Sequence, residues 1–230
     1  YGTNLLNNLT FSPEANAEIK DGDAISTNRG GEVEFKLKTE VTGVSIDATT
    51  GVVAIDNDSA TNGSTFTVVV YSRLDENICT EREYTIKCLE ATYHTNQKTD
   101  VDLSETADCE VLFSTVTDGT HTLSGDIDKI LLDGNSLTKD TDYTIADNKI
   151  TFVKSSLQNA GTGLKQVKVI TEQSSELYAY TFDMLLCSKI ITTAEQFKNL
   201  KSHYTQNGTA WYGYVLLGSD LDLNNCTFTN

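Results

Sequence analysis

Apolar and polar residues alternate along several short stretches of the chain. In residues 33–37, 66–71 and 83–88, apolar side chains recur at about every second position. Successive side chains of a β-strand point to opposite faces, so this pattern predicts strands that each bury one face. We interpret residues 75–77 as the loop between the strands at residues 66–71 and 83–88. Short strands separated by turn residues, without a helical period, predict a first β-sandwich.

A second series of strand-like segments follows. Strands are predicted over residues 110–113, 127–132, 143–145, 149–153, 165–170 and 177–186. The pairs Asp133-Gly134 and Asp147-Asn148 predict tight turns between strands. Residues 155–157 break the pattern and predict one helical turn. The series as a whole predicts a second β-sandwich.

The last block carries the clearest helical pattern. Thr192 and Glu195 fit a capping box, and Asn207-Gly208 predicts the end of the helix. Apolar residues recur between them at helical spacing, namely Phe197, Leu200 and Tyr204. A buried strand is predicted over residues 211–217, and its alternation continues to residue 223.

These elements predict an all-β fold class, with two tandem Ig-like β-sandwiches and a short C-terminal helix-plus-strand segment. A polar stretch at residues 94–99 follows a strand that ends near residue 90, so we place the first boundary there. The predicted domains are residues 1–90, residues 91–188 and residues 189–230, the last being the start of a third domain. The length of 230 residues suits two full domains and a remainder.

The charge balance narrows the choice of partners. Lys and Arg number 17 against 33 Asp and Glu, which gives a net charge of −16. Such a surface repels phosphate backbones and anionic lipids, so we expect no nucleic-acid partner. No stretch is apolar over the roughly 20 residues that span a bilayer, so we expect no membrane insertion. We expect any export signal and anchor to lie outside this sequence.

Residues 43–55 resemble the hairpin of bacterial Ig-like and cadherin-like repeats. In that hairpin a strand ends in an Asp-x-x-Thr-Gly turn, here Asp47, Thr50 and Gly51, and another strand returns. The physical chemistry agrees, because an Asp side chain can cap its own turn and Gly51 permits a positive φ.

Residues 101–186 resemble the X-two module, an Ig-like domain of bacterial glycosidases and of cellulosomal or cell-wall proteins. The resemblance lies in residues 130–137 (Ile-Leu-Leu-Asp-Gly-Asn-Ser-Leu), 140–145 (Asp-Thr-Asp-Tyr-Thr-Ile), 148–152 (Asn-Lys-Ile-Thr-Phe), 154–157 and 161–163. It implies binding to polysaccharides or cell surfaces, or a spacing role, and it brings no catalytic residues.

Residues 190–223 resemble the first repeat of parallel β-helices in bacterial surface proteins. Residues 194–197 (Ala-Glu-Gln-Phe) match the helix start, and residues 214–223 match the strand that follows. A helix in this place would cap the open end of a solenoid. Together the three resemblances imply an extracellular bacterial cell-surface protein.

One acidic cluster is a candidate calcium site. Asp56 and Asp58 lie close together on a predicted loop, and Asp47 is one turn away. Closely spaced oxygen ligands suit Ca²⁺, and we expect no other cofactor. The alternative is that these residues form solvated turns. Asp220 and Asp222 share a strand face, which we assign to solvent rather than to acid–base catalysis.

Aromatic residues near the end of the chain are candidates for stacking on sugar rings. Tyr178 and Tyr180 alternate along one predicted strand and so share a face. Trp211 is the third candidate. The alternative is that these rings fill cores or domain junctions.

The odd number of cysteines excludes complete internal pairing. One predicted disulfide joins Cys79 to Cys88, which would flank a hairpin. The other joins Cys109 to Cys187, near the first and last strands of the second domain. The alternative is that these are buried free thiols.

We therefore expect a non-catalytic module that spaces or attaches domains on a bacterial cell surface. Its expected partner is a glycan or a host or cell-surface protein. Three alternatives remain, namely a carbohydrate-binding module, an accessory region of a larger polysaccharide-degrading enzyme, and calcium-stiffened linkage between modules. No Ser-His-Asp or Cys-His pattern points to a catalytic site.

Overall fold

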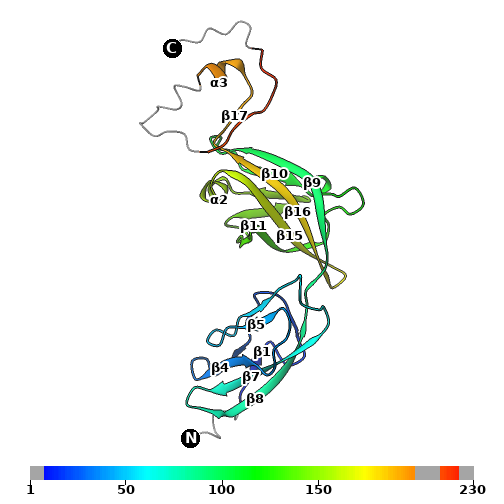
Figure 1. The fold of residues 1–230 in the computed structure, drawn as a ribbon, viewed down its shortest axis with the longest axis vertical. Helices are drawn as coiled ribbons and strands as arrows, with labels where there is room; N and C mark the ends of the chain where they lie inside the picture. Colours follow the sequence, from blue (N-terminus) through cyan, green and yellow to red (C-terminus); the bar gives the residue numbers. More distant parts are fainter. Residues whose placement is uncertain (1–7, 200–212, 223–230) are drawn as a thin grey trace. The chain divides into compact units, whose positions relative to one another are not determined.

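The computed structural model describes residues 8–199 and 213–222 (Figure 1). The chain divides into two compact units, the first formed mainly by residues up to Ala91 and the second mainly by residues from Thr92 onward. Strands dominate the described residues, and the helices among them are short. None of these helices is long and apolar enough to cross a membrane.

The first unit is a sandwich built on a four-stranded sheet. The sheet has the order β2-β8-β7-β4, in which β2 is parallel to β8 and the other pairs are antiparallel. Two short antiparallel pairs, β5-β6 and β1-β3, complete the unit. The bounds are β1 Phe11–Ser12, β2 Glu18–Ile19, β3 Ser26–Thr27, β4 Val33–Leu37, β5 Val44–Ile46, β6 Val53–Ile55, β7 Thr65–Ser72 and β8 Asp75–Ile86.

Apolar side chains of the sheet and of the β5-β6 pair meet in one core. Its members include Phe35 from β4, Val53 from β6, Phe66 from β7 and Tyr84 from β8. Strand alternation directs these side chains inward, because residues two apart share a face. The period-two pattern of the sequence is thus the direct cause of this core.

The predicted loop at residues 75–77 is wrong. These residues begin β8, and the chain reverses between Ser72 and Asp75, which face each other in the ladder. Arg73 and Leu74 therefore form a two-residue turn, and Leu74 is 96% exposed. The turn contains none of the Gly, Asn or Asp residues that mark most hairpins. The prediction therefore assigned the loop to the nearest polar residues, 75–77.

The second unit is a sandwich of two sheets. Its five-stranded sheet has the order β12-β11-β15-β16-β9, and its three-stranded sheet has the order β10-β14-β13. The short helices η1 and α2 connect strands. The bounds are β9 Leu89–Asp102, β10 Cys109–Leu112, η1 Phe113–Thr115, β11 Asp126–Leu132, β12 Asn135–Ser136, β13 Tyr143–Ala146, β14 Lys149–Phe152, α2 Lys154–Asn159, β15 Gly163–Gln173 and β16 Glu176–Cys187.

One core fills the space between these two sheets. Val111 and Phe152 come from the three-stranded sheet, whereas Ile130, Val169 and Phe182 come from the five-stranded sheet. Among the described residues, no buried side-chain nitrogen or oxygen lacks a hydrogen-bond partner. The predicted fold class, an all-β chain of two Ig-like sandwiches, is confirmed.

The polar stretch at residues 94–99, which was predicted to follow the last strand of the first domain, is itself part of a strand. It belongs to β9, the edge strand of the five-stranded sheet beside β16. An edge strand faces solvent along one side, so even its half-buried positions, such as Thr95, Gln97 and Thr99, carry polar side chains. The change between the two units near Ala91 thus falls inside a continuous strand.

The C-terminal segment pairs two strands in parallel. β17 (Lys189–Ile191) lies beside β18 (Val215–Leu217), and the helix α3 (Ala194–Lys198) follows β17. The helix has a capping box, but it joins Thr193 to Gln196, one residue later than predicted. Ala194 is the first helical residue, which places the cap on Thr193. The other predicted helix residues, Leu200, Tyr204, Asn207 and Gly208, lie outside the described residues.

Candidate functional site

Four aromatic rings gather on the second unit. Tyr93 of β9 lies 4.0 Å from the ring of His121, centroid to centroid, with the two planes 15° apart. Tyr178 of β16 lies 6.1 Å from Tyr93 on a nearly parallel plane, and Tyr180 lies 5.2 Å from Tyr93 at a tilt of 44°. β9 and β16 are neighbours in the sheet, so the three tyrosines meet across one strand pair.

A short loop holds His121 against Tyr93. Asp118 anchors this loop, because its carboxylate accepts hydrogen bonds from the backbone N–H groups of Thr120 and His121, at 2.8 and 2.6 Å. The Nδ1 atom of His121 lies 3.1 Å from the other carboxylate oxygen. The backbone hydrogen bond from His121, followed by its ring, lowers the pKa of Asp118 to about 2. The ionised carboxylate thus shapes the loop that presents the imidazole.

The predicted sugar platform is only partly present. Tyr178 and Tyr180 do share a face, but it is the core face of β16. Tyr180 is 3% exposed, and its hydroxyl lies 3.2 Å from the amide nitrogen of Gln173, so assigning it a sugar contact was wrong. Tyr178 is half-buried and remains accessible. Trp211 lies outside the described residues.

We expect acid to release the loop at Asp118. A carboxyl group with a lowered pKa stabilises the fold above its ordinary pKa of 3.8, and that stabilisation is lost as the pH falls through about 2. Carboxyl NMR titration should therefore give Asp118 an apparent pKa near 2, with the ring signals of Tyr93 and His121 moving in parallel. In Asp118→Asn this joint transition should vanish. A carboxyl that titrates near 3.8 would contradict the loop geometry.

The candidate calcium ligands do not converge. Asp47 and Asp56 flank the β5-β6 hairpin at opposite ends, because Asp47 pairs with Val52 and Asp56 with Gly43 through backbone hydrogen bonds of 2.8 Å. The Asp47 carboxylate accepts from the backbone of Thr49 and Thr50 and from the Thr50 hydroxyl.

Asp56 caps its own turn in the same way. Its carboxylate accepts from the backbone N–H of Asp58 at 3.1 Å and from the Ser59 hydroxyl at 2.6 Å. Over the described part of the chain, no group of three or more His, Cys, Asp or Glu residues is placed to hold a metal ion. Asp220 and Asp222 are both exposed, as predicted, but they lie beyond the end of β18 at Leu217, so the strand face predicted for them is not present.

The two predicted disulfides are wrong. Cys79, Cys88, Cys109 and Cys187 are all free thiols. Cys79 lies within β8 and Cys88 just beyond its end, so the extended chain of roughly 3.3 Å per residue keeps them far apart. Cys109 and Cys187 belong to different sheets of the second unit. Burial, the main cause, raises the pKa of the Cys109 thiol to about 11.

Thiol labelling should separate these cysteines. Cys79 is exposed and should react with iodoacetamide in the folded protein, whereas Cys88 and Cys187 are buried and should react only after unfolding. Peptide mass spectrometry assigns the label to each cysteine separately. Protection of Cys79, or a linked peptide whose mass is lower by two hydrogen atoms, would contradict this arrangement.

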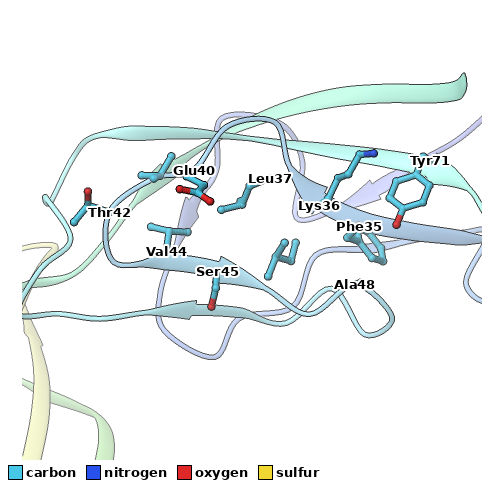
Figure 2. Close-up of a pocket in the computed structure, with 11 residues that line it drawn as sticks. Phe35, Lys36, Leu37, Glu40, Thr42, Val44, Ser45, Ala48 and Tyr71 are labelled. Carbon is cyan, nitrogen blue, oxygen red and sulfur yellow. The ribbon is translucent and has the colours of Figure 1, made fainter. Parts of the chain in front are cut away.

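A groove opens in the first unit between β4 and β5 (Figure 2). Its volume is about 720 Å³, within the range of ligand pockets. Phe35, Leu37 and Val44 line its apolar part. Glu40 lies toward one end and Tyr71 toward the other, as Figure 2 shows. The sequence did not reveal this groove, because it depends on which strands end up at sheet edges.

The comparisons with known proteins identify no family. No family model and no curated protein matches the sequence. Among solved structures, the N-terminal Ig1-2 module of the Drosophila receptor protein tyrosine phosphatase DLAR is 6% identical, with a TM-score of 0.41 over 77% of this chain and 98% of that one. Drosophila N-cadherin EC1-4 is 13% identical, with a TM-score of 0.28 over 77% of this chain and 49% of that one.

A bacterial enzyme is among the similar structures as well. A tri-modular GH5 endo-β-1,4-glucanase from Bacillus licheniformis is 11% identical, with a TM-score of 0.31 over 78% of this chain. The chain spans 38% of the length of that enzyme.

Proposed function

We propose that this chain is a non-catalytic module of an extracellular bacterial cell-surface protein, where it spaces or attaches other domains. The observation that carries the proposal is how the carboxylates are used. Asp47, Asp102, Asp118, Asp133 and Asp142 each accept hydrogen bonds from backbone N–H or hydroxyl groups, and the pKa of each is lowered.

Hydrogen bonds cause these shifts. The pKa of Asp133 is lowered chiefly by the backbone N–H of Gln166, and that of Asp142 by the hydroxyl of Ser156. Burial acts to raise the pKa of Asp102, but hydrogen bonds from Ser104 and its other partners outweigh it. A general acid in glycoside hydrolysis needs the opposite shift, which keeps its proton near neutral pH. These carboxylates therefore serve as anchors of turns and loops.

Two further observations support the bacterial surface setting. The order of strand motifs in residues 130–152 resembles the X-two module, which occurs as a spacer or binding domain. The parallel pairing of β17 with β18, with α3 between them in sequence, is the strand direction that a parallel β-helix requires. We include in the proposal that residues from 189 onward begin such a repeat.

Two experiments test the proposal, an assay for polysaccharide cleavage and a replacement of this chain within its parent protein. The purified chain should release no reducing ends from a panel of soluble and insoluble polysaccharides. In the parent protein, this chain can be replaced by an unrelated pair of Ig domains of equal length. If the chain acts as a spacer, the parent protein should keep its function. If the chain acts in adhesion, the replacement should abolish attachment. Release of reducing ends that disappears on changing one of the five Asp residues to Asn would contradict the proposal.

A second candidate function is carbohydrate binding, supported by the parallel stack of Tyr93 and His121. The His121 side chain is 47% exposed, and Tyr178 lies on the next ring plane. Flat aromatic faces of this kind bind the apolar faces of sugar rings. Pull-down on cellulose, xylan and chitin should then weaken in His121→Ala and Tyr178→Ala. Tyr214, which is 56% exposed and outside the cluster, provides the matched control Tyr214→Ala.

A further inference from the structure

We infer that a polar cluster around Asp102 and Lys189 is a joint that fixes the direction in which the C-terminal segment leaves the second sandwich. Only Ser188 lies between the end of β16 at Cys187 and the start of β17 at Lys189. Even a one-residue connection has two soft backbone dihedrals, about which β17 could rotate. Contacts across the connection therefore decide whether the segment keeps one direction.

The carboxylate of Asp102 bridges the second sandwich and β17. Asp102 is the last residue of β9. One carboxylate oxygen accepts from the backbone N–H and the hydroxyl of Ser104, at 2.9 and 2.6 Å. The other accepts from the backbone N–H of Ile190 at 2.9 Å and from the Lys189 ammonium group at 3.0 Å. Four donors on one carboxylate thus hold the start of β17 against the end of β9.

The ammonium group of Lys189 completes the cluster. It donates to the Asp102 carboxylate and the Ser104 hydroxyl, at 3.0 and 2.9 Å, and to the Glu105 carboxylate at 3.0 Å. An ammonium group has three N–H donors, so each has an acceptor. The Lys189 and Asp102 side chains are only 18% and 12% exposed, so solvent screens this pair less than a surface ion pair.

Hydrogen bonds outweigh burial for both charged groups. Burial acts to raise the pKa of Asp102, but its bonds to Ser104, Ile190 and Lys189 lower the pKa below the ordinary value. Burial acts to lower the pKa of Lys189, but its bonds to Asp102 and Glu105 raise it. Both groups are therefore charged at neutral pH, and the cluster is an ion pair in the folded chain.

The end of β9 is itself fixed to the sandwich. The carbonyl of Asp102 accepts from the ammonium group of Lys154 at 2.7 Å, and Lys154 is buried. The carbonyl of Leu103 accepts from the side-chain amide of Gln158 at 2.9 Å. The N–H of Leu103 donates to the carbonyl of Cys187 at 2.8 Å. Because α2 and β16 hold these residues, Asp102 offers β17 an anchor that belongs to the sandwich.

A second contact attaches the other strand of the segment. Gly213 precedes β18 and packs so closely that an added Cβ atom would lie 2.5 Å from the hydroxyl oxygens of Ser188 and Thr162. The N–H of Ser188 donates to the carbonyl of Tyr214 at 2.7 Å. The ring of Tyr214 lies against Gly163 at the start of β15. Attachment of β17 and β18 at separate places removes the rotation that a single attachment would leave.

The joint goes beyond the proposed spacing role, and its value to that role rests on the proposal. A spacer that ends in a freely rotating link sets only the distance of the domain that follows. A spacer whose last segment moves with its sandwich also sets the orientation of that domain. Measurements on this chain alone test the joint, so a negative result would leave the spacing role standing.

Residual dipolar couplings, measured along several backbone bonds per residue, test whether segment and sandwich move as one body. In the unchanged chain, the couplings of residues 189–191 and 215–217 should fit the alignment tensor of the second sandwich. In Asp102→Asn they should fit it worse, because an NH₂ group replaces one acceptor oxygen. Amide exchange of Ile190 should become about tenfold faster, the expected effect of losing a hydrogen bond to a charged group.

Asp133→Asn is the matched control. The Asp133 carboxylate also accepts from a backbone N–H, that of Gln166 at 2.9 Å, and pairs with a lysine, Lys165 at 3.2 Å. It lies in the turn after β11, so its variant should leave the couplings of residues 189–191 and the exchange of Ile190 unchanged.

Lys189→Met is a second variant of the joint. It leaves the carboxylate of Asp102 its bonds to Ser104 and to the N–H of Ile190. It should speed the exchange of Ile190 by less than Asp102→Asn does. Exchange at the amide of Ile150, in the middle of β14, reports whether the sandwich stays folded. If Asp102→Asn unfolds the second unit, Lys189→Met decides the question.

Three results would overturn the inference. The first is that the couplings of residues 189–191 and 215–217 do not fit the tensor of the sandwich in the unchanged chain. The second is equal exchange of Ile190 in Asp102→Asn and Asp133→Asn. The third is that Lys189→Met keeps the couplings and the exchange of the unchanged chain, which would reduce the cluster to a surface ion pair.

Discussion

Phe152→Ala is expected to lower the free energy of unfolding of the second unit by about 3–5 kcal/mol, the usual range for deleting a buried aromatic ring. Phe152 lies in the central strand of the three-stranded sheet, facing Cys109 on one side and Tyr143 on the other. Its side chain is fully buried in the core. Alanine would leave a cavity bounded by both sheets, which neighbouring side chains fill only in part.

Leu112→Ala is the matched control for this prediction. Leu112 lies on β10 of the same sheet, but it is 50% exposed, so its truncation should cost no more than about 0.5 kcal/mol. Urea unfolding followed by circular dichroism gives the loss, and hydrogen exchange by mass spectrometry assigns it to the second unit. Equal losses in the two variants would show that Phe152 does not support the core.

Gly51→Ala is expected to destabilise the first unit by clearly more than the roughly 1–2 kcal/mol that left-handed backbone costs an L-residue. Gly51 has φ +71°, and a Cβ atom there would clash with the backbone carbonyl oxygen of Ile25. The N–H of Ile25 also donates to the carbonyl of Gly51 at 2.9 Å. Relieving the clash must therefore pull apart two segments that the core holds together.

Gly63→Ala separates the cost of the left-handed backbone conformation from the cost of the clash. Gly63 has nearly the same backbone conformation, φ +75°, and no atom lies within 4 Å of the position that an added methyl group would take. Its variant should therefore show the conformational cost alone. The excess loss of stability in Gly51→Ala, measured by urea unfolding, is the cost of the clash. If both variants lose the same stability, the close approach of residues 25 and 51 is not rigid.

Local chemistry explains which parts of the fold could be predicted. The alternation in residues 33–37 predicted β4 with its bounds, because the polarity of each residue indicates which face of the sheet its side chain occupies. The turn residues Asp133, Asp147 and Asn148 all adopt positive φ, between 48° and 55°. Asp and Asn tolerate that conformation better than most residues. Signals of this kind need only neighbours in the sequence.

The failures share a different cause. The aromatic cluster depends on Tyr93 and His121, which come from a polar strand and a loop and are brought to Tyr178 only by tertiary pairing. No spacing in the sequence marks them. The alternation of Tyr178 with Tyr180 was read correctly as a shared face, but alternation does not tell whether that face meets solvent or core.

Residues 94–99 also have a practical consequence for dissecting the molecule. They belong to a strand of fourteen residues that contains no glycine or proline. The polar composition makes these residues look like a suitable place to truncate the chain. A truncation there would remove β9, the outer neighbour of β16, and would expose the backbone amide and carbonyl groups of β16. Such exposed edges recruit other chains, so a truncated second unit that starts after residue 99 should aggregate on expression.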